Sequence, residues 1–190
     1  MKGFIAYDTV HGSTKAAAEA IAERLRERGH EVEIVSIKDG GVPPTSGDCI
    51  FIGSPTRGGT HTKGAREFIE SMDASYWNGR PVVLFDTLGP MPKKPNQQVM
   101  WMAVVEQKEA TAAQSMRKQC AGRGIRAREE LCHLPVKGMW GPLREDAPSA
   151  AKEYTREFLE DMEEPGEVSE RSSDPKPAQL DPIINAAKPV

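Results

Sequence analysis

Several features that would mark a whole class of protein are scarce in this sequence. It has three cysteines in 190 residues, Cys49, Cys120 and Cys132, an odd number without any CxxC pair. A disulfide framework is therefore not expected. We interpret the three side chains as small buried thiols, and the alternative is a reactive thiol at Cys132, which is followed by His133.

Charge of one sign and long apolar runs are also missing. The formal net charge is −3, so we expect neither nucleic acid nor an acidic membrane as a partner. No stretch reaches the apolar length that a transmembrane helix requires, and the first residues lack the layout of a signal peptide. We expect a cytoplasmic protein.

Common catalytic and nucleotide-binding patterns are absent as well. The four histidines, His11, His30, His61 and His133, are scattered, and no Ser/His/Asp or Cys/His arrangement can be recognised by spacing. Neither GxGxxG nor GxxxxGK[ST] occurs. The sequence therefore names no catalytic residue and no metal ligand.

What the chain does contain is an alternation of short apolar strands with helical patterns. Strands are predicted at 2–7, 31–37, 49–53 and 81–86, with a last one within 125–136; helices are predicted at 15–28, at 62–72, from Asn96 to about Cys120, and after Asp146. In the last helix, Tyr154, Phe158, Leu159 and Met162 are expected to face inward. This pattern predicts an α/β fold, a doubly wound three-layer αβα sandwich around a five-stranded parallel sheet.

The composition changes near residue 163. Residues 164–190 are rich in proline, serine and charge, and we predict a flexible tail after a domain that spans 1–163. A docking peptide around Leu180, Ile183 and Ile184 is the alternative for the end of this tail.

The turn TVHGST, Thr9 to Thr14, links the first predicted strand to the first helix. Ligands of doubly wound sheets bind beyond the carboxyl ends of the strands, and a helix start offers unpaired N–H groups that attract anions. Gly12 allows close approach of the backbone, and Thr9, Ser13 and Thr14 can add hydroxyl donors. The turn suits a single phosphate monoester; the alternative is that Ser13 or Thr14 only caps the helix.

Three loops together resemble those of the flavodoxin family. Thr9, Gly12 and Thr14 match its phosphate loop T-x-T-G-N-T; GSPTRGGT, 53–60, is similar to its loop after the third strand; and DTLGPM, 86–91, stands where it has the next loop. Over residues 1–162 the resemblance implies strand order 2-1-3-4-5 and FMN held by these loops. The cofactor-binding residues it implies are Thr9, Val10, His11, Gly12, Ser13, Thr14, Ser54, Pro55, Thr56, Arg57, Gly58, Gly59, Thr87, Leu88, Gly89, Pro90 and Met91.

The ring loops depart from the family pattern. The family often stacks Trp or Tyr on the flavin, whereas this chain has Arg57 in the second loop, and Leu88 and Met91 in the third. Cations gather there too, with His61 among them, and we expect them to make the reduction potential less negative than in acidic flavodoxins. The alternative for Arg57 is a solvated loop cation. The cations of this group are Arg57, Lys63, Arg66, Lys93 and Lys94.

Two further residues are assigned by hypothesis. If His11 faces the phosphate, FMN affinity should fall as pH rises through the range in which histidine loses its proton. Trp140, in the loop 136–143 after the last strand, is interpreted as packing, and contact with a partner or with the flavin edge is the alternative.

The leading functional prediction is an FMN-binding electron carrier that serves redox partner proteins as a monomer. The alternative is an NAD(P)H-dependent FMN reductase or quinone oxidoreductase, in which Arg57, His61 and Lys93 hold the anionic donor. A third alternative is a binding or regulatory module whose flavin site has decayed.

Overall fold

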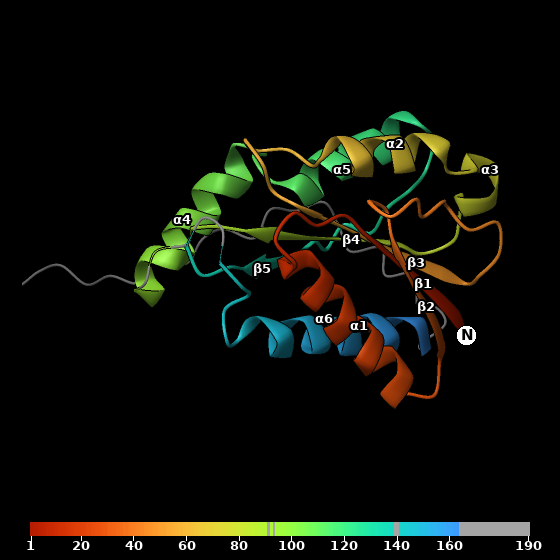
Figure 1. The fold of residues 1–190 in the computed structure, drawn as a ribbon, viewed down its shortest axis with the longest axis horizontal. Helices are drawn as coiled ribbons and strands as arrows, with labels where there is room; N and C mark the ends of the chain where they lie inside the picture. Colours follow the sequence, from red (N-terminus) through yellow and green to blue (C-terminus); the bar gives the residue numbers. More distant parts are fainter. Residues whose placement is uncertain (91, 93, 139–140, 164–190) are drawn as a thin grey trace, which may run out of the picture.

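A five-stranded sheet lies between two layers of helices (Figure 1). The computed structural model describes residues 1–90, 92, 94–138 and 141–163. All strands are parallel, in the order β2-β1-β3-β4-β5, which confirms the predicted fold and strand order. The strands are β1 (Lys2–Tyr7), β2 (Glu31–Ser36), β3 (Cys49–Pro55), β4 (Val82–Leu88) and β5 (Cys132–Pro135).

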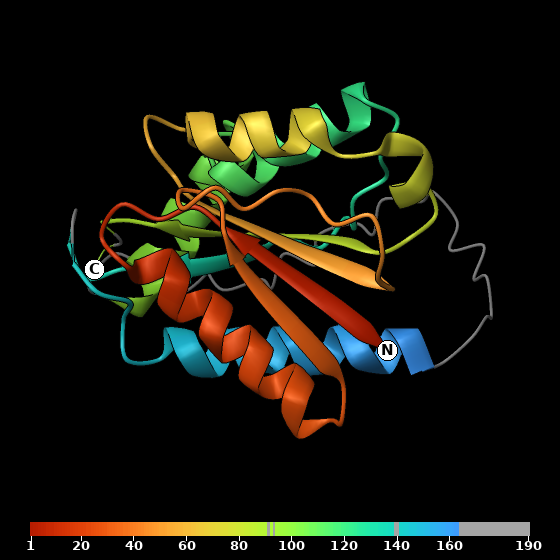
Figure 2. The ribbon, with the colours of Figure 1, turned by 45° about the vertical axis from the view of Figure 1, so that its right-hand side comes forward.

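Helices cover both faces of the sheet (Figure 2). Helices α1 and α6 pack side by side on one face, and α2 and α5 cover the other. Among the described residues, no helix combines the length and the apolar character needed to cross a bilayer. The helices are α1 (Ser13–Glu27), α2 (Lys63–Ser71), α3 (Ala74–Trp77), α4 (Pro95–Gln107), α5 (Ala112–Gly122) and α6 (Ala147–Glu163).

The interior strand β4 shows why the chain forms this sandwich. Val83 and Phe85 pack on the α1 and α6 side, whereas Val82 and Leu84 pack on the α2 and α5 side. A strand that is buried on both faces needs a continuous apolar run, and such runs are typical of parallel sheets. Since all the strands are parallel, the loops that follow them meet at one edge, which we call the carboxyl edge.

The long helix predicted from Asn96 to Cys120 is wrong, because the structure divides it into α4 and α5. Glu109 has a left-handed backbone with φ of 49°, which interrupts the helix. The Thr111 side chain then caps α5 by accepting a hydrogen bond from the Gln114 N–H at 3.1 Å. Helix α4 exposes apolar side chains, with Val99 74% and Met100 71% accessible.

The end of the domain agrees with the prediction in part. The last strand lies within 125–136, as predicted, at Cys132–Pro135, and Ala127 makes an isolated bridge to Val82. Phe158 and Leu159 are buried as predicted, but Met162, which was also predicted to face inward, is 40% exposed. The predicted tail, 164–190, lies outside the described residues, and so does the docking peptide proposed there.

The three cysteines are free and buried, which agrees with their interpretation as buried thiols. Burial raises the pKa of Cys49 and of Cys120 to about 12. Burial, and then the nearby Asp86 carboxylate, raises the pKa of Cys132. A thiol held in its neutral form is a poor nucleophile, so the alternative of a reactive Cys132 is wrong.

Candidate functional site

The turn after β1 presents an open helix start. Gly12 is the N-cap of α1 with a left-handed φ of 87°, and no side chain caps the helix, so the alternative that Ser13 or Thr14 is a cap is wrong. The first turn of α1 contains no acidic residue. A Cβ built on Gly12 would meet nothing within 4 Å, so the space next to this helix start is open. These features suit an anion.

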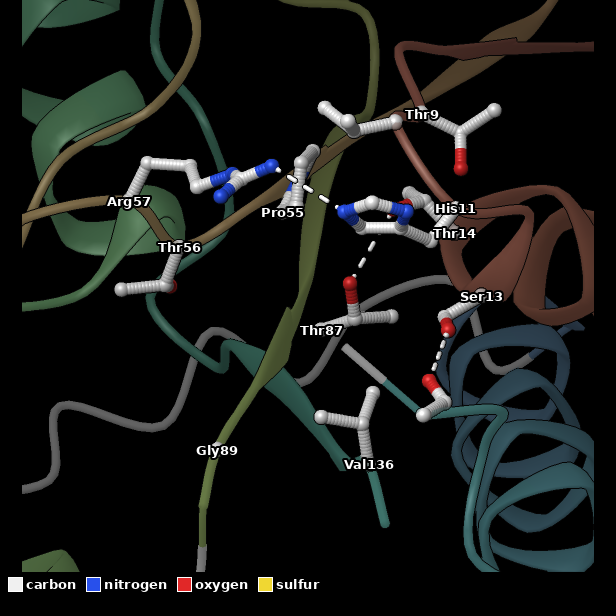
Figure 3. A pocket seen from close by; sticks show the side chains of 12 residues that line it. Thr9, His11, Ser13, Thr14, Pro55, Thr56, Arg57, Thr87, Gly89 and Val136 are labelled. Carbon is white, nitrogen blue, oxygen red and sulfur yellow. Dashed lines mark hydrogen bonds between the residues drawn. The ribbon is translucent and has the colours of Figure 1, made fainter. Parts of the chain in front are cut away.

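The hydroxyl groups of the turn are partly engaged within the protein (Figure 3). Thr9 Oγ1 accepts the Gly12 N–H at 3.0 Å, which leaves its own hydrogen available. Ser13 donates its hydroxyl hydrogen to the Gly141 carbonyl at 2.8 Å. Thr14 and Thr87 share one hydrogen bond of 3.0 Å between their hydroxyls. An anion at this turn would therefore depend mainly on the backbone N–H groups.

The loop after β3 forms a tight turn from Arg57 to Thr60. These residues exchange backbone hydrogen bonds of 2.8 and 3.1 Å. Gly58 and Gly59, between them, have φ of 57° and 81°, the pair of positive angles that this two-residue turn requires. The turn directs Arg57 to the site, where its Nη2 lies 3.5 Å from His11 Nε2 (Figure 3).

The loop after β4 approaches the loop after β5. A Cβ on Gly89 would lie 2.7 Å from Val136 Cγ2 and 3.0 Å from the Gly138 carbonyl oxygen. Only glycine therefore allows this contact. Leu88, predicted to cover a flavin, is only 2% exposed and does not line the pocket.

A pocket opens where these four loops meet (Figure 3). Ten of its twelve lining residues were predicted from the sequence, and the two that were missed come from the loop after β5. The sequence could have indicated them, because the loop after the last strand must lie at the same edge of the sheet as the other three loops. The lining residues are Thr9, Val10, His11, Ser13, Thr14, Pro55, Thr56, Arg57, Thr87, Gly89, Val136 and Gly141.

The other predicted residues fall into two groups. Six stand beside the pocket without lining it: Gly12, Ser54, Gly58, Gly59, Leu88 and Pro90. Ser54 is fully buried and accepts a hydrogen bond from the Thr62 N–H at 3.0 Å. Met91 lies outside the described residues, as do Lys93 and Trp140.

The lining has a polar and an apolar part. Threonine and serine side chains stand near the start of α1, whereas Val10, Pro55 and Val136 contribute apolar surface. None of the described residues that line the pocket is Phe, Tyr or Trp. No group of three or more His, Cys, Asp or Glu within the described part of the chain is placed to hold a metal ion.

His61 does not belong to the pocket. It is 6% exposed, with Nδ1 at 3.0 Å from Ser115 Oγ and Nε2 at 2.9 Å from Gln119 Oε1, both on α5. Burial lowers the pKa of His61 despite the hydrogen bond with Gln119, which acts in the opposite direction. The hypothesis that His61 helps to hold an anionic donor is therefore wrong.

The remaining predicted cations differ in position. Lys63 extends into solvent, with its Nζ 3.4 Å from a Glu67 carboxylate oxygen, and Arg66 is exposed on α2. Among the described cations of this group, Arg57 alone lines the pocket. Within the described part of the chain, the local positive field that the sequence predicts thus depends largely on Arg57.

Comparison with known proteins supports the same fold. A sequence model described as a flavodoxin domain matches residues 4–137, more than half of the chain. Comparison with curated protein sequences gives no match.

Solved structures resemble the chain at low sequence identity. Oxidised flavodoxin 1 from Bacillus cereus is 18% identical with a TM-score of 0.56, covering 84% of this chain and 98% of its own. A flavodoxin from the domain Archaea is 17% identical with a TM-score of 0.59, covering 86% and 100%. Rubredoxin oxygen:oxidoreductase from Desulfovibrio gigas is 16% identical with a TM-score of 0.59, covering 85% of this chain but 36% of its own. The structures establish the shared fold, and the domain match establishes that the chain belongs to the flavodoxin domain family.

Proposed function

We propose that this chain binds FMN in the pocket at the carboxyl edge and carries electrons between redox partner proteins. The observation that carries the proposal is the uncapped start of α1, free of acidic residues, beside a pocket formed by the loops after β1, β3 and β4. We assign the phosphate of FMN to the N–H groups of this turn, and its ring to the part of the pocket near Pro55, Arg57 and Gly89. Bound FMN would supply the one- and two-electron chemistry.

The lining predicts that the phosphate of FMN contributes more to its affinity than the ring does. Charge-assisted hydrogen bonds from the α1 start hold the phosphate, whereas no Phe, Tyr or Trp among the described lining residues stacks on the ring. Riboflavin, which has the ring without the phosphate, should therefore bind ~100-fold more weakly than FMN, from about 3 kcal/mol of lost phosphate contacts.

Titration of the flavin-free protein with each compound, followed by quenching of flavin fluorescence, measures this difference. Equal affinities for FMN and riboflavin would contradict the phosphate site. Failure of both to bind would indicate a binding module without flavin instead.

A second candidate is an NAD(P)H-dependent oxidoreductase that reduces a quinone or a similar acceptor. One observation favours it: Arg57 lies in the pocket, where it can meet an anionic donor. Anaerobic mixing of the FMN-loaded protein with NADPH tests it, since rapid bleaching at the flavin absorption maximum is expected only of the enzyme. An electron carrier should stay oxidised until a separate reductase is added.

We further propose that the carrier is a monomer. A single domain with the pocket at one edge can present its cofactor to successive partners without a second subunit. Sedimentation at several protein concentrations tests this proposal. A mass that doubles at high concentration and returns to that of one chain on dilution would contradict it.

A further inference from the structure

A buried carboxylate and a histidine face each other next to the pocket. Asp86 and His133 are direct partners in the pairing of β4 with β5. The Asp86 side chain is fully buried, and its Oδ1 lies 2.9 Å from His133 Nδ1. Nothing in the spacing of the sequence joins these two residues, which are 47 positions apart.

Two further donors surround the same carboxylate. Asp86 Oδ2 accepts the Ala113 N–H at 2.9 Å, at the start of α5. It also accepts the Thr56 hydroxyl at 3.3 Å. A buried carboxylate with three such partners can keep its negative charge, because the hydrogen bonds compensate for lost hydration.

Thr56 connects this pair to the pocket. Its side chain lines the pocket, and its Oγ1 also accepts the Ala112 N–H at 2.9 Å. Because Oγ1 is held by Ala112 and donates to Asp86, the carboxylate lies one hydroxyl group away from the pocket. Charge in the pocket and charge on the Asp86–His133 pair are therefore close enough to interact.

His133 has contact with solvent on its other side. Its side chain is 11% exposed and lines a second cavity, together with Gln114, Arg117, Glu129 and Leu131. Among the residues whose side chains the structure describes, the charged groups around it include the Asp86 carboxylate from β4, the Arg117 guanidinium from α5 and the Glu129 side chain from the segment before β5. Arg117 Nη1 donates to the Glu129 carbonyl at 3.0 Å, which fixes this cation next to the cavity.

We infer that the Asp86–His133 pair couples reduction of the bound flavin to proton uptake by the protein. With His133 protonated the pair is neutral overall, and with His133 neutral it carries one negative charge. Negative charge that arrives in the pocket must strengthen proton binding at His133, and by linkage protonation of His133 must favour reduction. His133 is thus a positioning residue that acts through Asp86 and Thr56.

The inference rests on the proposed function. Its electrons and protons are all accounted for. Bound FMN, if fully reduced to an anionic form, would take up two electrons from a chemical or protein donor and one solvent proton. A second solvent proton compensates the remaining negative charge by forming an N–H bond on the imidazole of His133. No bond of the protein is broken.

NMR titration of the histidine C–H signals tests the coupling directly, with FMN-loaded protein that is either oxidised or reduced by dithionite. The proton affinity of His133 should rise about tenfold on reduction, which moves its titration midpoint up by about one pH unit. His30, which lies beside the N-terminus, serves as an internal reference and should not move. A change below twofold at His133 would overturn the inference.

A matched pair of variants gives a second readout. H133Q keeps a side-chain donor for Asp86 but does not titrate, and H30Q removes a histidine far from the pocket. In wild type and H30Q, the potential of bound FMN should fall more steeply with pH across the titration of His133 than in H133Q. Identical slopes in all three proteins would overturn the inference.

FMN binding is measured first, by fluorescence quenching. Absence of binding overturns the proposed function together with the inference. Binding with an unmoved His133 signal overturns the inference alone.

Discussion

The two ends of the pocket are built in different ways. The end at α1 uses the backbone of one continuous turn, with Gly12 at the N-cap and no side-chain cap. The other end, near Arg57 and Gly89, is assembled from the loops after β3, β4 and β5. We call these the phosphate end and the ring end.

The difference teaches where binding strength and redox tuning reside. Backbone N–H groups at a helix start are fixed by the helix itself, so the phosphate end is preorganised. At the ring end, the described lining residues offer one cation and a few apolar side chains, whereas flat aromatic partners would bind a flavin more specifically. Affinity should thus depend on the phosphate end, and the reduction potential on the ring end.

The largest expected effect comes from negative charge at the phosphate end. G12D places a carboxylate in the open space next to the α1 start, and G12N places a neutral side chain of the same shape there. Both residues tolerate the left-handed backbone of Gly12 better than most. FMN affinity should be ~30-fold lower in G12D than in G12N, about 2 kcal/mol of repulsion.

Fluorescence titration measures this difference, and riboflavin is the control ligand. Because riboflavin lacks the phosphate, its affinity should be the same in both variants. Equal FMN affinities in G12D and G12N would show that the phosphate binds elsewhere, and the comparison between the two ends would fail.

The contrast also explains what the sequence could predict. The turn Thr9–Thr14 follows from local rules, since an apolar strand, a glycine and a helix start are adjacent in the chain. The alternation of strands and helices likewise predicts the sandwich. The sequence thus gives an adequate account of the sheet and of the phosphate end.

The ring end depends on contacts between distant segments, and the sequence misplaces part of it. His61 looks like a loop histidine, but residues of α5, over 50 positions away, bury it. Val136 enters the pocket only because β5 pairs with β4. The same pairing brings Gly141 to the other end, where its carbonyl accepts the Ser13 hydroxyl. The break between α4 and α5 could have been found, because Thr111 is a typical N-cap residue.

The next effect concerns His61, which anchors the loop after β3 to α5. H61Q removes a buried imidazole that bonds to Ser115 and Gln119, and should lower the free energy of unfolding at pH 7.5 by about 1 kcal/mol. Because burial lowers the pKa of His61, the unfolded chain binds the proton more readily. Wild type should therefore lose stability as pH falls from the ordinary histidine pKa toward the lowered one.

Urea denaturation at pH 7.5 and at pH 5.5 measures both effects. The contribution of His61 is fully present above its unfolded pKa, so the difference between wild type and H61Q should shrink at the lower pH. A difference that grows on acidification would mean that His61 gains a proton on folding, contrary to its burial.

An effect of similar size is expected from the cation at the ring end. R57Q removes the positive charge and should make the potential of the reduction that forms the anionic flavin more negative by about 50 mV, after allowance for screening. R57K keeps the charge without the planar guanidinium, and should change the potential little. Spectroelectrochemical titration compares them; a potential that follows shape rather than charge would contradict the electrostatic account.

The smallest effect should come from adding an aromatic side chain to the lining. Val10 belongs to the turn of the phosphate end but is 47% exposed and lines the pocket, so the long side chain of V10W can extend a flat surface toward the ring without displacing the core. Stacking should tighten flavin binding about fivefold, or roughly 1 kcal/mol, and V10L controls for apolar bulk. Because the gain arises at the ring, FMN and riboflavin should benefit equally. A gain confined to FMN would place Val10 at the phosphate end, and the division of the pocket into two ends would have to be redrawn.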